Sequence, residues 1–510
     1  MAMARRRVRA ELVAVLVVFG AVQVLLQRAQ DRLWRNGLGP SGAAEYPRPG
    51  ADVVAGAADA TTVVLLGLAA CAVFGLLVLR AGRYAAVGGG RPAVAVLALL
   101  AVGWWLASPT LSIDAYSYLS HGRLAASGAN PYLTASADVA GSPYGARLLA
   151  AGWQPVHPQS PYGPLCTGIE RLAVVLSGDD VRLGVLLIEL PQLAAVLGTA
   201  AVTARFLRDA GPERRLRGVL LVLANPLVLV ELTGDGHVDA LMAALLVLAI
   251  LAAARARTAP AILALALAVL VKVNALPFVL PIAVALVVLR RGVRELLVGA
   301  AVGGAAAIAV GAALAAPYWA GPATFTGLAA SGTPSFGWNV AGLLRSQLAP
   351  PEASLYSPDQ AAGGVLLTQV LLVVLLVAGT AAASLRVRTP ADLARACGVV
   401  ALLVLLLLPL EWPWYAALPA AVLPLVPSRA HAIAVLVLAA GSRIVAPIGD
   451  AAQVGAVGTD LFESVQPLVG QTLPALIGLA LTVPALVRRG GVGPGRTASD
   501  ATRDEPRAGE

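Results

Sequence analysis

Apolar runs of about 15 to 25 residues recur along the whole chain, and each is long enough to cross most of the hydrocarbon core of a membrane. Only 13% of the residues are charged, whereas a soluble chain of 510 residues would carry about a quarter. The sequence therefore predicts one all-α polytopic membrane domain over residues 10–487, with about 13–14 transmembrane helices.

Arginines gather in short clusters between the apolar runs, as the positive-inside rule expects at cytoplasmic helix ends. This rule predicts a cytoplasmic basic N-terminus at 1–9, two long outer loops at 108–182 and 317–360, and a disordered cytoplasmic tail at 488–510. We therefore expect a multi-pass protein of the plasma membrane. The net charge of +9 follows from helix orientation, so no nucleic acid partner is expected.

Aromatic residues fall on one side of this predicted topology. All eight tryptophans and every tyrosine except Tyr84 lie on the outer side, whereas an aromatic belt would occupy both interfaces. Sugars stack on such rings, so the pattern is typical of a sugar-binding surface. The alternative is that the outer loops are simply longer.

The densest polar segment follows the third predicted helix, which ends near residue 107. It begins with Asp114 at the outer membrane surface, and a carboxylate held against aromatic rings is suited to accept a proton from a hydroxyl. The alternative is a solvated loop with interfacial tyrosines. The other candidate contacts in this segment are Tyr116, Tyr118, Arg123, Asn130 and Tyr132.

This segment carries a family resemblance. The string Asp-Ala-Tyr-Ser-Tyr at 114–118, with Gly-Arg at 122–123 and Gly-Ala-Asn-Pro-Tyr at 128–132, resembles the first outer loop of GT-C glycosyltransferases that use polyprenyl-phosphate sugars. It is most similar to the actinobacterial α-(1→6)-mannopyranosyltransferases of lipomannan synthesis. Ala-Asn-Pro-Leu at 224–227, Gly-His-Val-Asp at 236–239, and Lys272 with Asn274 also fit.

The resemblance implies a GT-C-like helix bundle that moves a hexose, expected to be mannose, from a polyprenyl-phosphate donor to a glycolipid or glycan acceptor. It also implies transfer on the extracytoplasmic face, with α-1,6 linkages and Asp114 as the base. Many GT-C enzymes have two adjacent acids in this loop, whereas this chain has one. The nearest acidic pair, Asp179–Asp180, is interpreted as the polar start of a helix over 183–204.

Breaking a sugar–phosphate bond requires groups that stabilise phosphate charge. The candidates are Arg123, His237, Lys272 and Arg443, with Asp239 beside His237. Lys272 is the only lysine in the chain, and its alternative role is that of an interfacial lysine that snorkels to water. His237 and Asp239 could orient each other or the phosphate, or could form a polar helix start.

Glu411 and Trp412 form a second acidic and aromatic cluster that could line the acceptor groove or anchor a hairpin at the interface. The three cysteines lack metal-ligand spacing, and no clear metal-binding pattern is present. We therefore expect no cofactor and no essential divalent metal, because the cations could replace one.

Two other functions share these features. A transporter or flippase of a lipid-linked sugar would place its binding residues near the bilayer midplane, often between repeated halves. A non-catalytic scaffold for envelope assembly would have no need of Asp114 near cations. Under all three hypotheses the chain contacts membrane lipid.

Overall fold

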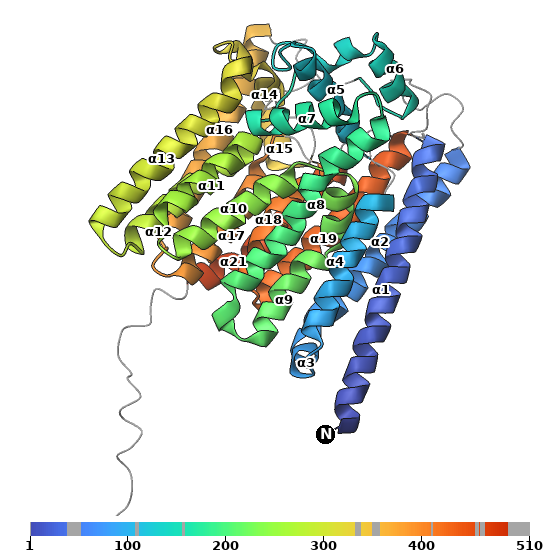
Figure 1. The fold of residues 1–510 in the computed structure, drawn as a ribbon, viewed down its shortest axis with the longest axis vertical. Coiled ribbons are helices and arrows are strands. Elements are labelled where there is room, and N and C mark those ends of the chain that lie inside the picture. Colours follow the sequence, from blue (N-terminus) through green and yellow to red (C-terminus); the bar gives the residue numbers. More distant parts are fainter. Residues whose placement is uncertain are drawn as a thin grey trace, which may run out of the picture.

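The computed structural model describes residues 2–37, 53–107, 112–155, 159–331, 338–348, 358–409, 412–453, 458 and 465–487. Within these ranges the regular elements are all helices, without a β-strand (Figure 1). The prediction of an all-α polytopic membrane protein is confirmed. The tail at 488–510 and Glu411 lie outside the described residues.

Nine helical segments in the described ranges are long and apolar enough to span a membrane. They are α1 (Ala2–Gly37), α2 (Val53–Leu79), α4 (Gly90–Ala107), α8 (Val181–Phe206), α13 (Val293–Ala315), α16 (Pro358–Ser384), α17 (Pro390–Leu407), α19 (Arg429–Gln453) and the run of η10 (Pro467–Thr472) with α21 (Leu473–Val487). A tenth span forms if α9 (Pro212–Leu223) and η3 (Val228–Gly234) are counted together across their 55° bend.

Shorter apolar helices account for the rest of the predicted spans. These are α10 (Asp239–Ala254), α11 (Thr258–Val271), η4 (Val273–Phe278) with α12 (Val279–Val288), and η8 (Pro413–Ala416) with α18 (Ala417–Val422) and η9 (Leu423–Leu425). The predicted count of spans is therefore reached only if these shorter segments also cross. The basic segment 1–9 continues into the first apolar run as one helix, because α1 begins at Ala2.

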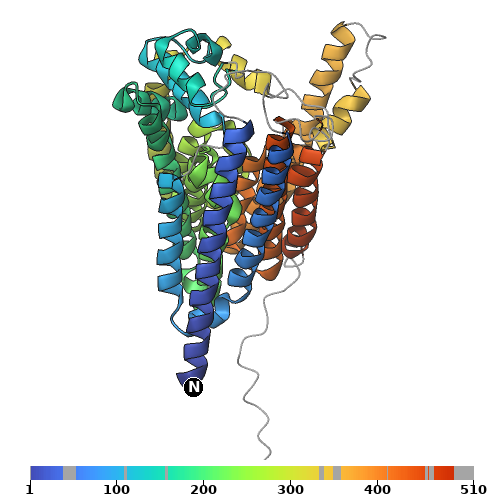
Figure 2. The same ribbon diagram turned by 90° about the vertical axis from the view of Figure 1, so that its right-hand side faces the viewer.

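Short helices from the first predicted outer loop gather at one end of the molecule. They are α5 (Asp114–Ala126), η1 (Ser136–Val139), α6 (Pro143–Ala150) and α7 (Pro164–Ser177), while the N-terminus and α3 (Ala81–Ala86) lie at the other end (Figures 1 and 2). The helix α7 is an apolar stretch within this loop, and it packs against α5. The second loop contributes η5 (Ala316–Tyr318), η6 (Ala323–Phe325), α14 (Thr326–Ser331) and α15 (Val340–Leu348).

Local sequence signals explain where α7 and α8 begin. Pro164 occupies the first turn of α7, where its missing N–H would have no helical partner. The Asp180 side chain accepts a hydrogen bond from Leu183 N at 3.0 Å and thereby caps the N-terminus of α8. The short helix η2 (Arg208–Ala210) follows the C-terminal end of α8. The interpretation of Asp179–Asp180 as a helix start is confirmed for Asp180.

The contact between α5 and α7 depends on Gly122. A Cβ atom placed there would lie 2.3 Å from the backbone oxygen of Glu170, closer than two such atoms can approach. Gly122→Ala should therefore push α5 from α7 and destabilise the fold by about 1–3 kcal/mol. Thermal unfolding in detergent measures this. Gly168→Ala on α7 is the matched control, because its Cβ would meet only Leu314 at 3.9 Å and stability should stay close to that of wild type.

Two buried apolar clusters hold the bundle together. One joins α1, α2, α4, α9 and α19, and the other joins α5, α7, α10, α11, α12 and α17. At the edge of the bundle α13 instead exposes Leu297, Val298, Val302 and Ile308, as a helix in contact with lipid tails does.

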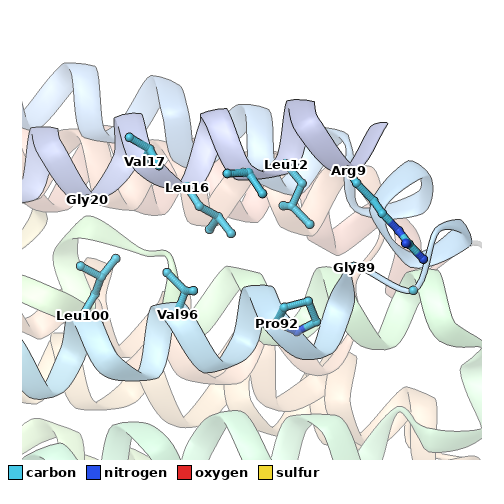
Figure 3. Close-up of a pocket in the computed structure, with 11 residues that line it drawn as sticks. Arg9, Leu12, Leu16, Val17, Gly20, Gly89, Pro92, Val96 and Leu100 are labelled. Carbon is cyan, nitrogen blue, oxygen red and sulfur yellow. The ribbon is translucent and has the colours of Figure 1, made fainter. Parts of the chain in front are cut away.

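An apolar groove of about 530 Å³ lies between α1 and α4 (Figure 3). Leu12, Leu16, Val96 and Leu100 line it, and the guanidinium of Arg9 at its end donates hydrogen bonds to the carbonyl of Val87 at 3.2 and 3.1 Å. The groove contains none of the predicted site residues. Its lining suits the alkyl chain of a membrane lipid.

Candidate functional site

A break in the chain after α9 creates the central part of the site. Pro226 has no N–H to donate, and the Asn225 side chain accepts a hydrogen bond from Leu227 N at 3.0 Å, so the α-helix stops here. The chain then widens into the π-helix η3, where Asp235 N donates to Val230 O at 2.9 Å. Such π segments are frequent at functional sites. Here the π-helix places Glu231 and Asp235 beside each other in the interior.

Gly236 turns the chain from η3 toward α10. Its φ of +67° favours glycine, and a Cβ atom there would lie 2.6 Å from Cγ of Glu189 on α8. The next residue, His237, is fully buried between two acids. Its Nδ1 lies 3.4 Å from Oδ2 of Asp114, and its Nε2 lies 3.7 Å from Oε2 of Glu231.

Asp114 is the first residue of α5 and is 5% exposed. The N-terminal end of a helix stabilises a carboxylate there. The hydroxyl of Tyr118, one turn later, lies 3.5 Å from Asp114 Oδ2. Burial, and then the neighbouring Tyr162, raise the pKa of Tyr118 well above its usual value, so its hydroxyl keeps its proton at neutral pH. The structure thus brings Asp114, Tyr118 and His237 together.

Arg443 of α19 forms a buried ion pair with Glu231 of η3. Both side chains are almost completely enclosed, and Nη2 of Arg443 also contacts Oγ of Ser442 at 3.0 Å. A buried arginine needs such a partner, because an isolated charge in this environment is costly. Arg443 is therefore connected to His237 through Glu231, and through His237 to the predicted base Asp114.

Lys272 is paired with Asp239 and does not reach toward water. Its Nζ lies 2.8 and 3.0 Å from the two carboxylate oxygens of Asp239, and the lysine is 8% exposed. The snorkelling alternative is therefore wrong. The suggestion that Asp239 and His237 orient each other is also wrong, since residues two apart at a helix start do not face each other. Asp239 binds Lys272, whereas His237 meets Asp114 and Glu231.

Aromatic rings link these pairs. Lys272 Nζ lies 4.4 Å from the ring centroid of Tyr415 and 5.8 Å from that of Tyr162, and Tyr162 packs edge-on against Tyr118 at 5.2 Å. Trp414 contacts Tyr415 and stacks on His237 with 3.8 Å between ring centroids. The contacts therefore run in a closed ring from Asp114 through Lys272 and back to His237.

The stack of rings on His237 reaches the protein surface. Trp412 stacks on Trp414 with 5.1 Å between ring centroids and is 41% exposed. Glu411, predicted beside it, lies outside the described residues. Trp412 thus joins the same site as Asp114, although almost 300 residues separate the two in sequence.

Other predicted residues of the first outer loop contact different groups. Arg123 lies at the far end of α5, 5.1 Å from the ring centroid of Tyr144 on α6. Asn130 donates to Tyr318 O at 2.8 Å, and the Tyr132 hydroxyl lies 2.9 Å from that of Thr167. These contacts hold the loop in place. Tyr116 is buried in the apolar cluster that joins α5 and α7 to α10, α11, α12 and α17. Substrate contacts by this group stay predictions.

A set of four residues that we call the carboxylate cluster comprises Glu189, Glu231, Asp235 and His237, all buried. One potential ligand atom from each of Glu231, Asp235 and His237 lies within 4.8 Å of the others, which suits a metal ion. The two glutamates are not among the site residues predicted from the sequence. Their position inside apolar runs was the signal that could have included them.

Glu170 on α7 is a further buried acid, outside this cluster. Burial raises its pKa from 4.5 to about 8, although the thiol of Cys166 donates to its Oε1 at 3.3 Å and acts in the opposite direction. Between these values the folded protein binds one proton more than the unfolded chain, so stability should fall as pH rises through this window. The thermal midpoint of the wild-type protein should be higher at pH 5 than at pH 8. Glu170→Gln should reduce that difference, and an unchanged difference would contradict the assignment.

Comparison of the sequence with known proteins identifies a family. A family model described as alpha-(1->6)-mannopyranosyltransferase, N-terminal domain, matches residues 12–290. The chain belongs to this alpha-(1->6)-mannopyranosyltransferase family. The matched region contains Asp114, Glu231, His237 and Lys272, while Trp412 and Arg443 lie beyond it.

Individual relatives of this mannopyranosyltransferase family align over shorter regions. Alpha-(1->6)-mannopyranosyltransferase A of Corynebacterium glutamicum is 29% identical over 151 residues, which is 30% of this chain and 30% of the relative. The protein of the same name from Mycobacterium tuberculosis is 31% identical over 146 residues, 28% of this chain and 26% of the relative. The alignments thus span less than a third of either relative. No solved structure matches the chain.

Proposed function

We propose that the protein transfers a hexose, mannose by family membership, from a polyprenyl-phosphate donor to the hydroxyl of a glycan or glycolipid acceptor. The observation that carries this proposal is the position of Asp114. It is a buried carboxylate at the start of an outer-loop helix, in contact with His237 and Tyr118, and its contacts lead on to the buried ion pairs of Arg443 and Lys272. Family membership supports mannose as the sugar and α-1,6 as the linkage.

The reaction is a direct displacement. Asp114 accepts the proton of the acceptor hydroxyl, the acceptor oxygen bonds to the anomeric carbon, and the bond from that carbon to the phosphate oxygen breaks. Polyprenyl phosphate leaves with the electron pair, and Lys272 and Arg443 stabilise its charge. A β-linked donor then gives an α-linked product by inversion. Arg123 remains a proposed contact of the donor phosphate from its place on α5.

The aromatic stack suits the acceptor or donor sugar. The exposed side of Trp412 offers a flat surface at the rim, and Trp414 connects this surface to His237 in the interior. A sugar stacked on Trp412 would lie near the opening of the site, with its hydroxyls directed toward polar groups inside. This arrangement supports the sugar-binding interpretation of the outer aromatic residues.

The orientation belongs to the same proposal. The helices α5, α6 and α7 lie at the end opposite the N-terminus, and the first arginine cluster lies at that N-terminus (Figure 2). Together with the positive-inside rule, this arrangement supports cytoplasmic termini and a site on the extracytoplasmic face of the plasma membrane. We expect membrane lipid around the bundle and no nucleic acid partner. We also keep the expectation that transfer requires no divalent metal.

Transfer can be tested with membranes that contain the protein and labelled polyprenyl-phosphomannose. The expected result is a labelled glycan or glycolipid whose new bond is α-1,6, with no product from membranes that lack the protein. A second donor, polyprenyl-phosphoglucose, tests the identity of the sugar. Movement of intact donor across the membrane without a glycosidic product would instead support the transporter hypothesis.

A further inference from the structure

The carboxylate cluster has the composition of a metal site. Glu231, Asp235 and His237 offer two carboxylates and an imidazole, and all three are buried at the turn between η3 and α10. Carboxylate oxygens and imidazole nitrogens together are ligands of Zn²⁺ and Mn²⁺. The chemistry of these side chains therefore agrees with a divalent cation of the first transition row.

The distance between two of these ligands is informative. Nε2 of His237 and Oε2 of Glu231 are 3.7 Å apart, which is too long for a hydrogen bond. Two ligands bound at about 2.0–2.2 Å to one tetrahedral ion lie roughly 3.4 Å from each other. Arg443 binds the other oxygen, Oε1, so Oε2 is the oxygen on the side of His237. The pair needs only a small adjustment to accept an ion.

The orientation of the His237 ring fits the same role. Its Nδ1 faces the carboxylate of Asp114 at 3.4 Å, while Nε2 points toward Glu231. Histidines that bind metals commonly present their second nitrogen to a carboxylate, which fixes the ring and the tautomer that leaves the other nitrogen free. Asp114 is positioned to do this for His237.

Glu189 of α8 provides an independent observation. It is 1% exposed, and neither of its carboxylate oxygens has a hydrogen-bond partner among the residues that the structure describes. A Cβ atom at Gly236 would lie 2.6 Å from its Cγ, so Glu189 packs against the residue that stands between the ligands Asp235 and His237 in the sequence. A buried carboxylate is costly, and a cation bound next to it would lower that cost.

We infer that Glu231, Asp235 and His237 bind one divalent cation of the Mn²⁺ or Zn²⁺ type, with the carboxylate of Glu189 as a neighbouring negative charge outside the ligand set. The glycine at 236 allows Glu189 of α8 to pack against the turn that holds the ligands, and Asp114 supports the histidine from outside. This site goes beyond the proposed transfer reaction and does not depend on it. Binding of the ion is a property of the protein alone.

The test uses the full chain purified in detergent and stripped with EDTA, without donor or acceptor. Titration with Mn²⁺ by calorimetry should show one saturable site per chain, and Zn²⁺ should compete for it. Electron spin echo spectra of bound Mn²⁺ should show coupling to an imidazole nitrogen. Asp235→Asn and Glu189→Gln should each weaken Mn²⁺ binding by about 10–100-fold or more.

Glu170→Gln is the matched control, because Glu170 is also a buried glutamate with one oxygen lacking a hydrogen-bond partner but lies on α7 outside the cluster. It should bind Mn²⁺ as wild type does. Absence of saturable Mn²⁺ and Zn²⁺ binding to wild type would overturn the proposal, as would equal binding by Glu189→Gln and wild type. If Asp235→Asn does not fold, the nitrogen coupling in wild type and the Glu189→Gln titration decide the question. Failure here leaves the transfer assay unaffected.

Discussion

Asp114→Asn is expected to lower the rate of mannosyl transfer by about 10²–10⁴-fold, the contribution of a positioned general base. The amide has nearly the shape of the carboxylate but cannot accept a proton from the acceptor hydroxyl. Its contacts with Tyr118 and His237 can be retained, so the loss should appear in kcat more than in KM. The measurement is product formation from labelled polyprenyl-phosphomannose in membranes with equal amounts of folded protein.

Asp180→Asn is the matched control for this experiment. Asp180 lies in the same predicted loop but caps α8, and asparagine is an equally good helix cap. Transfer by this variant should equal that of wild type. An Asp114→Asn protein with unimpaired transfer would rule out Asp114 as the base. A scaffold would form no product with or without the substitution, which separates that hypothesis from an enzyme.

The second large effect concerns the buried pair of Lys272 and Asp239. Lys272→Met should destabilise the fold by about 3–5 kcal/mol, because the Asp239 carboxylate would stay buried without its cation. Lys272→Met combined with Asp239→Leu should recover much of this loss, since both charges are then absent. Thermal unfolding can be followed with a thiol-reactive dye, because Cys71, Cys166 and Cys397 are all buried.

An exposed pair provides the comparison. Nε of Arg208 lies 3.0 Å from Oδ1 of Asp209, and the two side chains are 53% and 85% exposed. Breaking this pair with Arg208→Met should change stability by less than about 1 kcal/mol, since solvent screens exposed charges. Equal melting of Lys272→Met and wild type would show that the Lys272–Asp239 pair does not support the fold. Lys272 would then be free to serve the donor phosphate alone.

Much of the site could be found from the sequence because charged residues are rare in apolar runs. Lys272 and Arg443 stood out for this reason, Asp114 because it begins the densest polar segment, and His237 through the Gly-His-Val-Asp string. The structure brings all four into one connected set of contacts. Arg123 shares a helix with Asp114 but contacts Tyr144, because nine residues of α-helix separate the two by about 13 Å.

The partners of these residues could not be predicted. Glu231 meets Arg443 and Asp239 meets Lys272 only because a π-helix and a broken helix pair bring distant segments together. The π-helix has no strong sequence signal beyond Asn225-Pro226, which marks where α9 ends but not how the chain continues. His237 contacts Asp114 and not Asp239, and this choice of partner follows from the same turn at Gly236.

The sequence by itself determined that this protein lies in a membrane and that Asp114 is its candidate base. The length of the apolar runs requires a membrane, and a single acid among aromatic residues marks the first outer loop, because hydration of charge and burial of apolar surface act locally along the chain. Only the tertiary structure decided which buried charges neutralise one another and that Glu189 lies against the turn at Gly236. Those interactions depend on distances of a few ångströms between helices, and distances of that kind are set by packing.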